Sequence, residues 1–242
     1  MALDAFKDIV EHTHALGFIE IVKVIGTATD AKIETIDNDK TVVIYGEMYQ
    51  PIKDVESTIG LSRLAILKGY MAIHAESTIK IVKENRAGVD TPSELHFADA
   101  DGNNDNYRFM SEAMANEQVK VPPFRGATWN ITFVPGKKEI SRLSERQSLL
   151  GGFEKRFTVS VDAKNDLRFA IGSGPTDRSN IVFANNVTGT LKHQWTYPLT
   201  QVLSILKLAG DITMSFSDMG AMKIDIDSGV GKYTYIIPAG KS

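Results

Sequence analysis

The chain has 242 residues, of which 43% are hydrophobic and 24% are charged, and it contains no cysteine. These fractions exclude an intrinsically disordered protein, the lack of cysteine excludes disulfides and thiolate metal sites, and the length favours two domains. The formal net charge of -3 argues against a uniformly basic coat for nucleic acid, so a DNA-binding surface would need segregated basic residues. Because we find no apolar run of about 20 residues and no basic amino-terminal segment, we expect a cytoplasmic protein without a membrane partner.

The first half of the chain begins with a helical pattern. Apolar residues at helical spacing predict an amphipathic helix over residues 3–15, stopped by Gly17. We expect its exposed face to be acidic, because Asp4, Asp8 and Glu11 outnumber Lys7. Residues rich in β-branched side chains then predict a meander of antiparallel strands over 18–25, 31–36 and 41–48. A second helix is predicted over Leu61–Lys68, ended by Gly69, with strands at 71–74, 78–83, 94–98 and 107–110.

Residues 111–125 lose this periodicity, and Pro122-Pro123 forces an extended backbone, so we expect an interdomain connector there. The second half then repeats the order of elements. It has a predicted strand at 129–133, a helix at 137–150, strands through Val187, a helix at 199–209 and further strands. The prediction is an α+β fold of two similar domains, each with two helices packed on antiparallel sheets. The expected boundaries are 1–112 for the first domain, 113–126 for the connector and 127–242 for the second domain.

The last third of the chain carries a specific resemblance. It contains Tyr197-Pro-Leu-Thr-Gln-Val-Leu-Ser-Ile-Leu-Lys207, a strand with Met214, then Asp225-Ile-Asp227 and Lys232-Tyr-Thr-Tyr-Ile-Ile-Pro-Ala239. This order of a helix, closing strands and an aromatic strand that ends on proline resembles the carboxyl end of DNA sliding clamps. The segment Ala31–Asp39 is also similar to a clamp strand that runs into a turn. The small size is more similar to the bacteriophage clamps, which are related in fold to proliferating cell nuclear antigen, than to cellular ones.

The resemblance implies a closed homotrimeric ring that encircles duplex DNA of any sequence, with helices lining the hole and sheets outside. Such a ring is a processivity factor for DNA replication that performs no reaction and uses no cofactor or metal. The implied partners are duplex DNA, DNA polymerase, a clamp-loader ATPase and further copies of the chain. If a phage encodes the protein, its place is the cytoplasm of the host cell.

A sliding protein must attract phosphates without recognising bases, so basic side chains are expected on helix faces toward the hole. The predicted helix over 137–150 supplies them best, because Lys138 and Arg142 lie opposite the apolar residues Ile140 and Leu143. The full set of DNA-binding candidates is Arg63, Lys68, Lys137, Lys138, Arg142, Arg146 and Lys207. The alternative is that these residues form ordinary solvated helix faces.

The resemblance also implies a hydrophobic pocket beside the connector, where client proteins insert a short peptide. By position, its candidate residues are Ile36, Val119, Val121, Tyr235, Ile237 and Pro238. Alternation along the last strand makes sheet core an equal alternative for Tyr235 and Ile237. Ring closure is expected to pair residues 107–110 of one copy with residues 180–183 of the next.

Several short motifs suggest other chemistry but lack companion residues. Asp99-Ala-Asp101-Gly-Asn103 is similar to a calcium loop, yet Asn104 and Met110 occupy the positions of its glycine and glutamate, so we predict a hairpin turn. Gly172-Ser-Gly174-Pro175 lacks the lysine of a phosphate-binding loop and is also predicted to be a turn. The histidines show no spacing typical of metal ligands; they are His12, His14, His74, His96 and His193.

Two other functions stay open at this point. A β-rich oligomeric protein of a virion or phage tail would have much the same composition, although it would not need cationic helix faces gathered on one surface. An acyl-transferring enzyme could use Ser204 and Lys207, which match a four-residue serine-lysine pattern but have no companion motif. Asp225 and Asp227 could form a carboxylate pair on one face of a strand, although solvent-facing alternation is the simpler account.

Overall fold

The computed structural model describes residues 2–75, 78–86, 88–173, 175 and 177–240. The chain forms two compact units, and the last strand is divided between them. The first unit consists of Met1–Pro122 and Asp227–Tyr233, and the second consists of Pro123–Ile226 and Thr234–Ser242. Both units combine helices with antiparallel sheets, which confirms the predicted α+β class.

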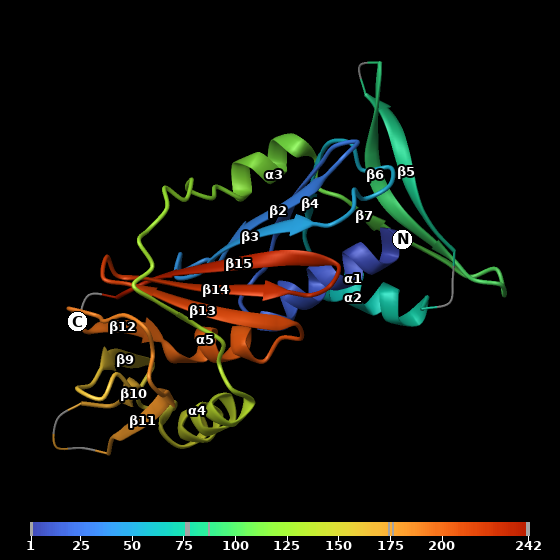
Figure 1. Cartoon of the computed structure of the whole chain (residues 1–242). Coiled ribbons are helices and arrows are strands. Elements are labelled where there is room, and N and C mark those ends of the chain that lie inside the picture. The colour runs from blue at the N-terminus through green and yellow to red at the C-terminus, as the bar shows by residue number, and fades with distance from the viewer. Residues whose placement is uncertain (1, 76–77, 87, 174, 176, 241–242) are drawn as a thin grey trace. The chain divides into compact units, whose positions relative to one another are not determined.

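The first unit contains a pair of helices, a third helix near its end and two sheets (Figure 1). One sheet has the order β4-β1-β2-β3 with β15 beside β3, and the other has the order β5-β6-β7. The helices are α1 (Ala2–His12), the short 3-10 helix η1 (His14–Leu16), α2 (Leu64–Ile73) and α3 (Glu112–Gln118). The strands are β1 (Val22–Gly26), β2 (Ala31–Ile36), β3 (Val43–Met48), β4 (Thr58–Leu61), β5 (Thr78–Arg86), β6 (Val89–Ala98) and β7 (Asn104–Arg108).

The second unit has the same kind of architecture, with one sheet in the order β11-β10-β9-β12 and another in the order β15-β14-β13-β8. Its helices are α4 (Lys137–Leu150) and α5 (Leu199–Leu206). Its strands are β8 (Ile131–Phe133), β9 (Arg156–Val161), β10 (Leu167–Ile171), β11 (Ser179–Ala184), β12 (Trp195–Pro198), β13 (Asp211–Ser217), β14 (Ala221–Asp227) and β15 (Gly231–Pro238).

Apart from β8, which has no counterpart among the described strands of the first unit, the two units repeat one topology, which confirms the predicted duplication. The order β4-β1-β2-β3 corresponds to β12-β9-β10-β11, and β5-β6-β7 corresponds to β13-β14-β15. Each unit also has one isolated bridge at an equivalent place. Gly60 in β4 pairs with Met110 just after β7, and Thr196 in β12 pairs with Gly240 just after β15. In both units this bridge joins the strand before the second helix to the end of the last strand.

A buried polar network holds α1 against the start of β15 in the first unit. The Asp8 carboxylate accepts hydrogen bonds from the Tyr233 hydroxyl at 2.7 Å and from the Ser228 hydroxyl at 3.1 Å. The His12 ring stacks on the Tyr233 ring with 4.4 Å between centroids. Asp8 is only 8% exposed, so the prediction that it belongs to an acidic outer face is wrong. A carboxylate can be buried here because hydroxyl donors replace the water that it loses.

Aromatic side chains fill the core of the second unit. Phe169 stacks on Phe183 with 4.1 Å between ring centroids and contacts Phe157 at 4.6 Å. Tyr197 packs against the Phe157 and Phe216 rings at 6.1 and 5.8 Å. Within the part of the chain that the structure describes, the buried Tyr197 hydroxyl has no hydrogen-bond partner. The cost of removing the Tyr197 hydroxyl from water is therefore not offset by a hydrogen bond from the described residues, whereas the Tyr233 hydroxyl donates one to Asp8.

The predicted second helix is wrong at both ends. Leu61 pairs with Val22 in the sheet, and α2 begins only at Leu64. The helix then continues through Gly69 to Ile73, where a strand was expected, because Leu64, Leu67 and Met71 are buried on one face. A glycine inside a helix costs about 1 kcal/mol relative to alanine, which this packing outweighs.

The expected connector contains a helix, α3, over Glu112–Gln118. The Ser111 hydroxyl accepts a hydrogen bond from the backbone N–H of Met114 at 3.5 Å and caps its first turn. Ala115 is fully buried against the first unit. Serine followed by helix-favouring residues is a start signal for a helix, so this part of the connector was predictable from local sequence. Helix α4, by contrast, has the predicted bounds.

The two buried tyrosine hydroxyls give opposite predictions for stability. Tyr233→Phe should lower the free energy of unfolding by about 1–3 kcal/mol, because the Asp8 carboxylate loses a donor while it stays buried. Tyr197→Phe should leave the free energy of unfolding unchanged or raise it by up to about 1 kcal/mol, because an unpartnered buried hydroxyl is removed. Urea denaturation followed by circular dichroism measures both. Equal destabilisation by the two substitutions would contradict the hydrogen-bond assignment.

Candidate nucleic-acid interface

The exposed face of α4 carries most of the predicted basic residues of the second unit. The helix begins at Lys137 directly after Gly136, whose backbone is extended, and Leu143 is its fully buried contact to the core. Lys137 and Lys138 are exposed, and Arg142 and Arg146 are partly exposed. The predicted orientation of this helix, with its basic residues away from the core, is therefore what the structure has.

The basic residues of the second unit differ in their ion pairs. Arg142 lies 3.7 Å from the Glu139 carboxylate, and Arg146 lies 2.7 Å from that of Glu145. Among residues 2–75, 78–86, 88–173, 175 and 177–240, none forms an ion pair with Lys137, Lys138 or Lys207. Exposed ion pairs contribute at most about 1 kcal/mol, so the two arginines can exchange their carboxylates for a phosphate at low cost. Lys207 follows the last residue of α5 and is exposed.

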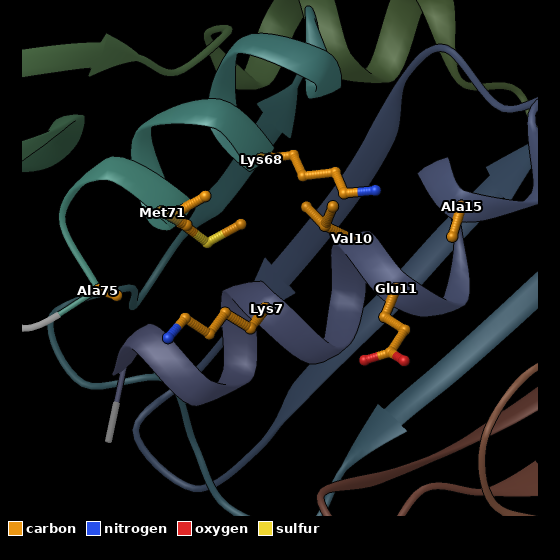
Figure 2. Close-up of a pocket in the computed structure, with 8 residues that line it drawn as sticks. Lys7, Val10, Glu11, Ala15, Lys68, Met71 and Ala75 are labelled. Atoms are coloured by element: carbon orange, nitrogen blue, oxygen red, sulfur yellow. The ribbon is translucent and has the colours of Figure 1, made fainter.

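A groove of about 440 Å³ lies between α1 and α2 in the first unit (Figure 2). Val10 and Met71, both nearly fully buried, form its apolar floor. Lys7 extends from α1 and Lys68 from α2 at the rim, with Glu11 as the acidic side chain. Lys7 and Lys68 are exposed. Because Asp8 is buried, Lys7 is a stronger candidate for an anion contact than the sequence alone indicated.

Arg63 lies just before α2 and has an unusual backbone conformation. Its φ of 51° and ψ of 46° fall in the left-handed region, which costs a non-glycine residue about 1 kcal/mol or more. Its side chain is exposed and borders a second groove of about 390 Å³, together with His14 and Glu20. The structure thus brings Arg63 near His14, a residue to which the sequence assigned no role.

Among the residues that the structure describes, strands β7 and β11 each end a sheet, so each has one edge without a strand partner there. α2 contacts β7, and α4 contacts β11. The helices and the turn after α4 carry large apolar side chains that are mostly exposed: Ile73 is 73% exposed, Leu149 76% and Phe153 88%. Exposed apolar side chains of this size next to an open strand edge are typical of an interaction surface.

The predicted pocket residues are distributed over both units. Ile36, Val119 and Val121 belong to the first unit, where Val119 is buried and the other two are partly exposed. Tyr235, Ile237 and Pro238 belong to the second unit. The side chains of Tyr235 and Ile237 are 0% exposed, so they cannot form the wall of a peptide pocket; the sheet-core alternative describes them correctly. Pro238 is exposed.

Two solved structures of the proliferating cell nuclear antigen, PCNA, match the chain over nearly its whole length. One is the PCNA of A. fulgidus with the C-terminal region of FEN-1 bound; it matches with a TM-score of 0.71 and 13% sequence identity, over 100% of this chain and 97% of that one. The other is the PCNA of Thermococcus kodakaraensis, with a TM-score of 0.70 and 10% identity, over 98% of this chain and 97% of that one.

The chain has the sliding-clamp fold. The sequence matches no protein-family model and no curated protein at a significant level. The likeness to the clamps is therefore one of structure, and it covers both units and the strand that they share.

An aromatic cluster at the end of the expected connector was not predicted from the sequence. The Phe124 and Trp129 rings stack with 6.1 Å between centroids and 23° between planes, and Phe124 is 42% exposed. The Lys223 ammonium lies 5.3 Å from the centre of the Trp129 ring, within the range of a cation–π contact. An aromatic residue directly after Pro122-Pro123 was the available signal, but its partner Lys223 could not be identified from local sequence.

The short motifs that suggested other chemistry serve structural roles in the clamp fold. The Asp99 carboxylate accepts hydrogen bonds from the backbone N–H groups of Asp101 and Asn103 at 3.0 and 2.9 Å, inside the turn between β6 and β7. The side-chain amide of Asn103 also donates to it, and these hydrogen bonds hold the Asp99 pKa below its usual value. The predicted hairpin turn is confirmed. Gly174, in the other glycine-rich motif, lies outside the described residues.

Asp225 and Asp227, the possible carboxylate pair, each interact with a different side chain. Asp227 accepts a hydrogen bond from the Tyr49 hydroxyl at 2.5 Å, which lowers the Asp227 pKa and, in turn, helps to raise the pKa of Tyr49 to about 12. Asp225 pairs with the Lys223 ammonium at 2.5 Å. Within the described ranges, no three His, Cys, Asp or Glu side chains are grouped to hold a metal ion. Nor does this part of the chain contain a helix long and apolar enough to span a bilayer.

Proposed function

We propose that this chain is one subunit of a ring-shaped sliding clamp that encircles duplex DNA and tethers DNA polymerase and other replication proteins. The observation that carries the proposal is the agreement of the duplicated two-unit fold with PCNA structures over the whole chain. The proposal includes a homotrimer of the phage type, opened by a clamp-loader ATPase and acting in the cytoplasm without catalysing a reaction. It also keeps 1–112, 113–126 and 127–242 as the two domains and their connector.

Ring closure follows from the internal repeat. Within the chain, β15 lies beside β3, and the counterparts of these two strands are β7 and β11, which each have an edge without a strand partner among the described residues. If β7 of one copy pairs with β11 of the next, the same arrangement is repeated between copies. Exposed Ile73 of α2, which contacts β7, and exposed Leu149 and Phe153 in and after α4, which contacts β11, would then become buried at this contact. Because the two surfaces differ, the contact is head-to-tail and generates a ring where the rotation closes.

The DNA-facing surface of the proposed ring consists of basic side chains that lack strong ion pairs. Lys137, Lys138 and Lys207 in the second unit and Lys68 in the first are exposed, and the ion pairs of Arg142 and Arg146 lie at the surface. Such side chains attract phosphates through long flexible stems and do not recognise bases, which suits a protein that slides. Arg63 completes the predicted set.

Client proteins would bind through a short apolar peptide, as the C-terminal region of FEN-1 is bound to the A. fulgidus PCNA. Of the predicted pocket residues, Ile36 and Val121 are partly exposed and Pro238 is exposed, so these three can contact a bound peptide. Phe124 stacked on Trp129 is a further candidate, because a partly exposed aromatic pair can anchor an apolar side chain.

Retention on circular DNA tests the proposed function. After loading, the protein should remain on a closed circular duplex at high salt, because a ring is held topologically and does not depend on ion pairs. After the circle is cut once by a restriction enzyme, the protein should slip off the ends. Gel filtration of the DNA with labelled protein measures both states. Salt-sensitive loss that is equal for circular and linear DNA would contradict encirclement.

The basic face of α4 gives a second prediction. The double variant Lys138→Glu with Arg142→Glu should weaken binding to duplex DNA and lower the slope of log affinity against log salt by about 1 for each phosphate that the protein no longer binds. Self-association should be unchanged. Lys164→Glu is the matched control, because Lys164 is an exposed lysine in the turn between β9 and β10 of the same unit. Loss of self-association in the double variant would instead place these residues in a subunit contact.

A further inference from the structure

We propose that the groove between η1 and the start of α2 binds a DNA phosphate through His14 and Arg63, with Lys68 in the neighbouring groove, and that DNA binding there takes up a proton at His14. The inference rests on the proposed clamp function and adds a residue and a pH dependence to it. The groove has a volume of about 390 Å³ and is bordered by His14, Glu20 and Arg63.

The local backbone places His14 at this groove. Helix α1 ends at His12, and η1 then turns the chain by three residues, from His14 to Leu16. Gly17 ends the turn with a φ of 82°, a conformation that favours glycine, and Leu16 is buried. The buried Thr13 and Leu16 thus flank His14, whose own side chain stays partly exposed.

Protonation of His14 adds to the positive charge of the groups around it. In the groove, the Arg63 guanidinium and the Glu20 carboxylate oppose each other in sign. Lys68 of α2 acts on His14 from the neighbouring groove, which Lys7 and Glu11 of α1 also border. With neutral His14 these five side chains have one net positive charge. With the imidazolium present, the cluster has two net positive charges, and His14 offers a second N–H donor for a phosphate oxygen.

In the free protein we expect the His14 side chain to be neutral near pH 7. Partial burial, and then the nearby Lys68 ammonium, lower the His14 pKa from its ordinary value of 6.5. A phosphate in the groove reverses this balance, because an adjacent negative charge favours the imidazolium. DNA binding therefore raises the His14 pKa, and by linkage a lower pH strengthens DNA binding.

The conformation of Arg63 is a second observation in favour of this groove. Arg63 adopts left-handed backbone angles at a cost, and no residue in the described part of the chain forms an ion pair with it. Strained residues with an unused charge are frequent at binding sites, where the contact with a ligand compensates the strain. A phosphate between Arg63 and His14 would supply that contact.

The experiment measures the affinity of the full chain for a short linear duplex by fluorescence anisotropy at pH 6 and pH 8. For the native chain we expect binding about fivefold to tenfold tighter at pH 6, since a pKa shift of one unit corresponds to a tenfold change. His14→Gln should bind weakly with little pH dependence, and His14→Lys should bind tightly with little pH dependence. His193→Gln is the matched control, because His193 is exposed in the second unit, and it should behave as the native chain does.

The outcomes separate this inference from the proposed function. Unchanged pH dependence in His14→Gln, or equal weakening by His14→Gln and His14→Lys, would overturn the role of His14 but leave the clamp proposal intact. Lack of retention on circular DNA at either pH would overturn the clamp proposal itself. The His14 imidazole resonance should titrate at higher pH when the duplex is present. An equal shift with inorganic phosphate at the same phosphate concentration would show a general anion site and contradict one for DNA.

Discussion

An unpaired strand edge is the constraint on which the proposed assembly depends. Within the described part of the chain, backbone donors and acceptors along β7 and β11 have no strand partner on one side, and such edges associate unless a protein blocks them. Charged side chains and bulges usually provide that block. Here β7 carries Asp105 and Arg108, but the segments next to the two edges also carry exposed Ile73, Leu149 and Phe153. In the proposed ring the duplication would make the two edges fit each other, because their counterparts β15 and β3 already lie side by side.

The same repeat requires that the last strand be held firmly in both units. β15 contributes Gly231–Tyr233 to the first unit and its remaining residues to the second. In the first unit, Tyr233 is fixed by the Asp8 carboxylate and by stacking on His12. In the second unit, Gly240, just after β15, donates its backbone N–H to Thr196 at 2.9 Å. Hydrogen bonds at both ends of one strand, of which the one at Tyr233 is buried, make its position specific, since a slip would leave polar groups unpaired.

Local patterns predicted the elements whose signals lie within them. Helix α4 has an apolar periodicity bounded by Gly136 and Gly151, and its predicted bounds were correct. The predicted helix begins three residues before α2 and ends five residues before it. Glycine signals a helix end in local sequence, but here the burial of Leu67 and Met71 outweighs the low helix propensity of Gly69. The helix in the connector was missed although Ser111 marks its start. Alternation showed that Tyr235 and Ile237 share a face but could not show that this face is buried.

The candidate site was less predictable than the fold, since it depends on residues that are distant in sequence. Asp8 was assigned to the exposed face of α1, yet its partners Ser228 and Tyr233 come from the other end of the chain. The role proposed for His14 depends on Arg63, just before helix α2, and on Lys68 within that helix. The basic face of α4 was predictable because one helix holds all of it. The ion pairs of Arg142 with Glu139 and of Arg146 with Glu145 are local as well, because each pair lies within the same helix.

Cysteine cross-linking between copies tests the central claim most directly, because the natural sequence contains no cysteine. One cysteine replaces Asn104 or Asn106 on β7, and a second replaces Asn180 on β11; all three asparagines are exposed. If β7 and β11 of different copies pair, oxidation should give a covalent oligomer larger than a dimer on denaturing gels, and each single-cysteine variant should not. Monomer alone from every double variant, at concentrations where the native chain remains on circular DNA, would contradict the proposed ring contact.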